Sequence, residues 1–125
     1  MVANNKYGGL TFEGQRNHVS FNLEAAVENG DVVTATATDG ALGRGSSGDE
    51  IVGVVMRKEN DNVGGVKLVG TNEIITLPRT GAITSGVQAL AVAGDGTVIA
   101  GTGTRTFMVI GTQTVETVDY VTFVL

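Results

Sequence analysis

The residues from Gly43 to Gly48, GRGSSG, have the glycine spacing G-x-G-x-x-G that cradles the phosphates of dinucleotides. In that role the segment opens a helix whose N-terminus faces the pyrophosphate. Here it is followed by Asp49 and Glu50, whose carboxylates would repel phosphate, and then by an apolar run rich in Val. We therefore interpret residues 40–50 as an exposed surface loop and not as a nucleotide site.

Other catalytic arrangements find equally little support in the sequence. His18 is the only histidine and there is no Cys, while Ser20 is too near His18 to imply a triad. Asp61 and Asp95 lie in short polar stretches without the Asp-x-Asp-x-Asp-Gly spacing of a calcium loop, so we predict that both are turn residues. The Gly-x-Val/Ile-Asp-x-x-Tyr motif of the trimeric dUTPases, the enzyme alternative, is absent as well. We expect no enzyme, no metal site and no cofactor.

Composition places the chain among the β proteins. Its 125 residues include 19 Gly but only one Pro and no Trp, and Val and Thr, which suit pleated strands, are abundant. The formal charge of −5 and the scattered basic residues argue against nucleic acid as a partner. No apolar run approaches the length of a membrane span, and the first ten residues lack the apolar region of a signal peptide. We expect a soluble protein made in a cytoplasm, with no membrane partner.

Short β-branched runs separated by Asn-Gly and Asp-Gly turns predict a series of strands. These are Val32–Thr38, Ile51–Arg57, Val66–Val69, Glu73–Leu77, Val87–Ala93, Thr97–Ala100, Thr106–Ile110 and Val118–Leu125. In the last strand, Val118, Tyr120, Thr122 and Val124 share one face, and the alternate residues share the other. Both faces are largely apolar. We expect one to cover the core and the other to lie against more protein.

The two halves of the chain resemble each other. Val63, Val66, Leu68 and Val69 match residues 118, 121, 123 and 124 at a constant offset of 55. Either Val-rich segments agree by chance, or the domain consists of two similar β units closed on each other, which removes sheet edges. The predicted fold is all-β: a small, compact, β-barrel or β-tulip-like domain over residues 27–125.

Residues 1–26 differ from the rest, because they are polar and rich in Gly and Asn yet carry large apolar side chains. These are Tyr7, Leu10, Phe12 and Phe21, together with smaller aliphatic residues. A disordered segment normally lacks aromatics. Two interpretations remain open: a strand packed on its own domain, or an extended N-terminal arm that becomes ordered only against a partner.

A series of soft motifs over residues 27–125 resembles the capsid decoration, or cement, proteins of tailed bacteriophages. The motifs are Gly30–Val33 (GDVV), Gly53–Val55 (GVV), Leu77-Pro78, Ile83–Gly86, Ile110-Gly111 and Val121–Leu125 (VTFVL). Gly86-Val87 departs from the Gly-Asp that is usual at that strand entry.

The resemblance implies a structural virion protein on the outer capsid surface that bridges subunits of the major capsid protein. It also implies a homotrimer whose N-terminal arm contacts the shell, with Tyr7, Leu10, Phe12 and Phe21 as anchors. One alternative is a tail or fibre domain. Another is a carbohydrate-binding module, although the lack of Trp argues against it.

Overall fold

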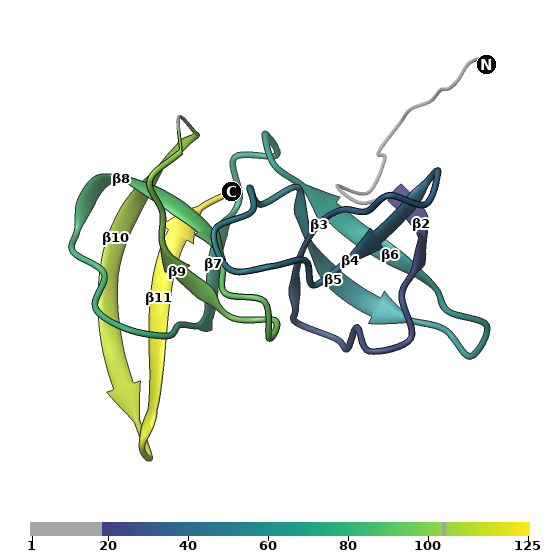
Figure 1. Cartoon of the computed structure of the whole chain (residues 1–125). Coiled ribbons are helices and arrows are strands. Elements are labelled where there is room, and N and C mark those ends of the chain that lie inside the picture. The colour runs from purple at the N-terminus through teal and green to yellow at the C-terminus, as the bar shows by residue number, and fades with distance from the viewer. Residues whose placement is uncertain (1–18, 104) are drawn as a thin grey trace, which may run out of the picture.

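The computed structural model describes residues 19–103 and 105–125, which form ten strands and no helix, so the all-β prediction is confirmed. No segment among them is a helix that could span a membrane. The strands make two five-stranded units that lie side by side (Figure 1). The first unit contains β2 (Val19–Leu23), β3 (Val32–Ala35), β4 (Ala41–Gly43), β5 (Gly53–Lys58) and β6 (Val63–Leu68). The second contains β7 (Ile74–Pro78), β8 (Gly86–Val92), β9 (Val98–Ala100), β10 (Thr106–Val115) and β11 (Val118–Val124).

The first unit is a closed barrel in the order β2-β4-β3-β5-β6. Strand β2 closes it, because β2 pairs with β6 on one side and, in parallel, with β4 on the other. Small branched and aliphatic side chains fill the interior, among them Leu23, Val33, Val55 and Val66. A Cβ at Gly64 would come within 2.7 Å of Leu23 Cδ1, so the absence of a side chain there lets the barrel close tightly.

The second unit has the strand order β7-β11-β10-β8-β9. Replacing each strand by the one five places earlier gives β2-β6-β5-β3-β4, the order found in the barrel. The bulges coincide too: the register of β5 shifts between Val55 and Arg57, and that of β10 between Val109 and Gly111, 54 residues later. Where the barrel has its parallel β2–β4 pair, the second unit has only a single parallel bridge, Arg79 to Val98. The hypothesis of two similar β units is confirmed.

The main hydrophobic core lies between the two units. The inner face of the second sheet supplies Phe107, Val121 and Phe123, and the outside of the barrel supplies Val32 and Val54. Phe107 and Phe123 meet edge to face with ring centroids 5.5 Å apart. The alternation predicted for the last strand is confirmed, since its Val121 and Phe123 are buried.

Polar contacts join the units beside this core. The backbone N–H of Val32 donates to the carbonyl of Gly96 at 3.0 Å. Arg44 Nε donates to Asp31 Oδ2 at 2.7 Å, and this hydrogen bond raises the pKa of Arg44. Asp31 is itself buried, and Gly96 packs directly against its carboxylate. The carboxylate is therefore covered by the β8–β9 turn, while its hydrogen bonds, from the Glu28 N–H and from Arg44, stay within the first unit.

Two local predictions need correction. Residues 40–50 are not a simple exposed loop, because 41–43 form β4 with Leu42 buried, and Glu50 forms an antiparallel bridge with Ala91 of β8. The first strand of the closing pair runs to Val115 and not Ile110, since the polar connector is itself paired. For the segment 1–26 a packed strand and an arm were both open, and its residues 19–23 form β2, a strand of the barrel.

Candidate functional site

The outer face of the second sheet is the most unusual surface of the described residues. Strand pairing brings together Met108 with Val87, and Val115 with Val118, and places Ile110 at the bulge between them. Ile74 lies opposite Val124 on the far strand. We call this surface the uncharged face. Its exposed apolar residues are Ile74, Val87, Met108, Ile110, Val115 and Val118, with Thr76, Gln113, Tyr120 and Thr122 between them.

The exposure of these side chains is high. Val87 is 69% exposed, Ile74 66% and Met108 57%. Only two further large apolar side chains are exposed among the described residues, Val19 and Met56, and both belong to the barrel. Large apolar side chains scattered singly are ordinary, whereas a set gathered on one face indicates a surface that other protein covers.

No residue of this face carries a charge at neutral pH. The charged residues of the second unit lie at strand ends and turns, as Arg79, Asp95 and Glu116 do, or on the inner register, as Asp119 does. The barrel differs: its outside carries the ion pairs Lys67–Glu73 at 2.6 Å and Arg57–Glu59 at 3.4 Å. The uncharged face can therefore bind a partner by apolar contact and neutral hydrogen bonds, but not by ion pairs.

The uncharged face is hollowed at the bulge. Ile110, Gly111, Thr112, Gln113 and Thr122 line a hollow of about 170 Å³. The hydroxyl oxygens of Thr122 and Thr76 are 2.8 Å apart and hydrogen-bond to each other along one side. Because Gly111 has no side chain, the strand leaves room there for a single side chain from outside.

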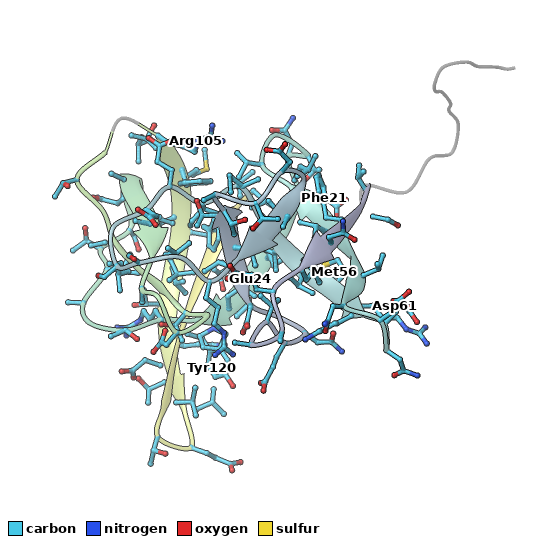
Figure 2. The ribbon with its side chains drawn as sticks, turned by 45° about the vertical axis from the view of Figure 1, so that its right-hand side comes forward. Phe21, Glu24, Met56, Asp61, Arg105 and Tyr120 are labelled. Atoms are coloured by element: carbon cyan, nitrogen blue, oxygen red, sulfur yellow. The ribbon has the colours of Figure 1, made fainter. Side chains whose placement is uncertain are left out.

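A second hollow, of about 370 Å³, lies on the barrel between β2, β5 and β6. Its lining includes Gly64 and Gly65, together with Ser20 and Met56. Arg57 and Glu59 give it a polar rim, and Ser20 of β2, the second described residue, lines it as well (Figure 2 labels Met56). An apolar side chain with a polar edge would suit its lining, which includes a flexible Met.

Of the four predicted anchor residues, Phe21 alone lies within the described residues. It is partly buried on β2 opposite Gly64 and packs against the barrel core, so its own domain already holds it. Tyr7, Leu10 and Phe12 lie outside the described residues. A further signal was present in β10, where exposed Met108 and Ile110 alternate with buried Phe107 and Val109 as in the last strand.

The other sequence motifs have structural roles. Gly43–Gly48 opens no helix, and the N–H of Gly48 donates to the carbonyl of Val92, which ties the segment to β8. Asp95 Oδ1 accepts hydrogen bonds from the side chain and backbone of Thr97, and these lower the pKa of Asp95. Asp95 and Asp61 are turn residues, as predicted.

No protein-family model matches the chain, and a search of curated proteins gives no significant match. The function must therefore be inferred from the residues and their geometry.

Proposed function

We propose that this protein has a structural, non-enzymatic role as a decoration protein on the outer surface of a tailed-phage capsid. It is made in the host cytoplasm, assembles as a homotrimer and stabilises the shell by bridging subunits of the major capsid protein. The observation that carries the proposal is the gathering of six exposed apolar side chains on one uncharged sheet face, which is typical of a protein that acts through contact with other protein. The capsid is named as the partner because residues 27–125 resemble the decoration proteins of tailed phages.

The N-terminal segment is the proposed contact with the major capsid protein. Tyr7, Leu10 and Phe12 supply large apolar groups in an otherwise polar sequence, and the segment joins the fold at β2 beside the larger hollow. Each contact is modest. Because several arms are linked in one trimer, binding of the first arm raises the effective concentration of the others, and the shell is held by many weak contacts together.

A sedimentation experiment tests the proposal. Purified full-length protein is mixed with expanded empty heads of the phage that encodes it, and we expect it to sediment with them. A variant lacking residues 1–18 should stay in the supernatant, as should the triple variant Tyr7→Ala, Leu10→Ala, Phe12→Ala. The matched control replaces polar residues of the same segment, Asn4→Ala, Asn5→Ala and Gln15→Ala, and should bind like the full-length protein.

Two results would contradict the proposal. Full-length protein that does not bind heads would remove the capsid setting, and assembly of the pure protein into tubes or fibres would support the tail or fibre alternative. Unchanged binding of the truncated protein would contradict only the proposed role of the N-terminal segment and would leave capsid binding in place.

A further inference from the structure

We propose that the uncharged face is the surface on which a second copy of this chain docks, so that the outer faces of the second sheets are buried where copies meet around a symmetry axis. The partner is thus a molecule of the same sequence and the same charge. Three observations carry this assignment.

The first observation comes from the internal repeat. In the barrel, Val32 of β3 pairs with Val54 of β5, and both side chains are on the outside of the barrel and at most 1% exposed, because the second unit covers them. The corresponding pair in the second unit is Val87 and Met108, 55 and 54 residues later, and it is also on the outside. Its members are 69% and 57% exposed.

The repeat therefore has a packing surface at this position, and within the chain the inner face of the second sheet covers it. Within residues 19–103 and 105–125, nothing packs on the corresponding surface of the second unit, where Val87 and Met108 are exposed. Repeated units bury continuous apolar surface against each other, and a terminal unit normally ends in a polar outer face. The outer face of the second unit is apolar instead, so burial against another copy would continue the same pattern.

The second observation is electrostatic. Each chain has a formal charge of −5, so two copies repel each other, and they can come into contact at low cost only through surfaces without charge. The uncharged face is such a surface. A partner of opposite charge would instead be recognised by acidic side chains on the face that receives it, and this face has none.

The third observation is the residue content of the face. Met108 and Tyr120 belong to the types enriched where proteins meet, and Lys, Glu and Asp, which are depleted there, are absent. The hollow at Ile110 and Gly111 gives the face a depression into which a side chain of the neighbouring copy can insert. Thr76 and Thr122 already pair with each other, so burial leaves their hydroxyl oxygens partnered.

The proposed function includes a homotrimer, and this inference assigns the surface that would form it. It is tested without capsids, so that a failure to self-associate can be distinguished from a failure to bind heads. The measurement is the mass of the full-length protein in solution by light scattering coupled to size exclusion. We expect the wild type to elute at a multiple of its chain mass of 12.8 kDa.

Charge substitutions test the surface. Met108→Lys and Ile110→Lys place a charge on the uncharged face, and each should shift the mass to that of a single chain or weaken association at least about tenfold. The matched control is Asn22→Lys, which adds the same charge at an exposed position of β2. All three variants reduce the net negative charge of the chain and therefore the long-range repulsion between copies. If repulsion alone mattered, each variant would associate more strongly than the wild type. The control should keep the wild-type mass.

A second measurement does not depend on breaking the assembly. The chain has no Cys, so Met108→Cys introduces a single thiol on the face and Asn22→Cys a single thiol on the barrel. A short bis-maleimide should link Met108→Cys chains into covalent dimers and leave Asn22→Cys chains single. Far-ultraviolet circular dichroism checks that each variant keeps its β structure.

A wild type that is monomeric at tens of micromolar would overturn the inference, as would lysine variants that keep the wild-type mass. A monomeric wild type whose lysine variants fail to bind heads would assign the face to the capsid instead, and would equally overturn it. Dissociation of the Asn22→Lys control would show that association uses another surface.

Discussion

At the scale of single residues, the same Asp-Gly turn occurs once in each unit, and one of the two turns lies at the contact between the units. Asp39-Gly40 joins β3 to β4, and Asp95-Gly96 joins β8 to β9, and both glycines have positive φ angles, +72° and +96°. The surroundings differ. Nothing lies near the Cβ position of Gly40, whereas a Cβ on Gly96 would overlap the buried carboxylate of Asp31.

This difference predicts unequal costs for the same substitution. Gly40→Ala should lower the free energy of unfolding by about 1–2 kcal/mol, the cost of an alanine in the left-handed region. Gly96→Ala carries that cost and in addition displaces Asp31 from Arg44, so we expect a loss of about 3 kcal/mol or more. Urea denaturation of both variants measures the difference. Equal losses would show that Asp31 moves aside freely beneath the β8–β9 turn.

The sequence was sufficient to predict these turns but not their unequal importance. An Asp-Gly pair between two β-branched runs predicts a hairpin from local chemistry alone. The burial of Asp31 depends on Arg44 and Gly96, which are distant along the chain, and on the packing of one unit against the other. Nothing in the residues near Asp31 distinguishes it from an ordinary turn aspartate.

At the scale of elements, the β10–β11 hairpin extends beyond the rest of its sheet (Figure 1) and ends in an unfavourable turn. Val115 pairs with Val118, so the loop has two residues, Glu116 and Thr117, with φ angles of 49° and 71°. A two-residue loop with both φ values positive strongly prefers Asn-Gly, and a β-branched residue there is strained.

Replacing Glu116-Thr117 by Asn-Gly should therefore raise the free energy of unfolding, by about 1–2 kcal/mol, because the strain at residue 117 disappears. Thermal unfolding checks this as a higher Tm. The control, Thr112→Gly, makes the same change at an extended position of the same hairpin and should lower stability by up to about 1 kcal/mol. A lower Tm for the Asn-Gly variant would mean that the side chains of Glu116 and Thr117 stabilise the tip in another way.

Strand β2 limits how many N-terminal residues can be removed without opening the barrel. Removing residues 1–18 leaves all ten described strands, and we expect the midpoint of thermal unfolding to stay close to that of the full-length protein. Removing residues 1–26 deletes β2, opens the barrel between β4 and β6 and exposes Leu42 and Val66, so we expect a loss of cooperative unfolding. A cooperative transition at an unchanged Tm in the shorter variant would show that β2 is dispensable and restore the longer arm.

The elements that the sequence analysis missed lack the features on which prediction depends. Strand β4 has three residues and contains a Gly, and the Gly and Ser around it are typical of a loop. The second half of β10 is polar because it extends past the core, and Glu-Thr is not the usual chemistry of a tight turn. The long Val, Ile and Thr runs, in contrast, predicted the other strands to within a few residues, since burial and β propensity agree there.

At the scale of the whole molecule, the repeat explains why one surface is left apolar. Each unit has an inner and an outer face, and the outer face of the barrel at Val32 and Val54 is covered by the second unit. Alternation in the last strand predicted that its second face lies against more protein, and that expectation stays a prediction. If a second copy covers the face, as we propose, no pattern within one chain specifies the geometry of that contact.

If copies of this chain meet through the uncharged face, their association has a distinctive salt dependence. The charges that oppose it are spread over the rest of two acidic molecules, and the contact contains none that salt could weaken. Raising the salt concentration from about 0.05 to 0.5 M shortens the screening length and should therefore tighten association several-fold. Lowering the pH toward the isoelectric point of 4.6 removes the same repulsion and should act in the same direction. Sedimentation equilibrium measures both effects, and weaker association at high salt would instead indicate an interface held by ion pairs, on the charged surface of the barrel.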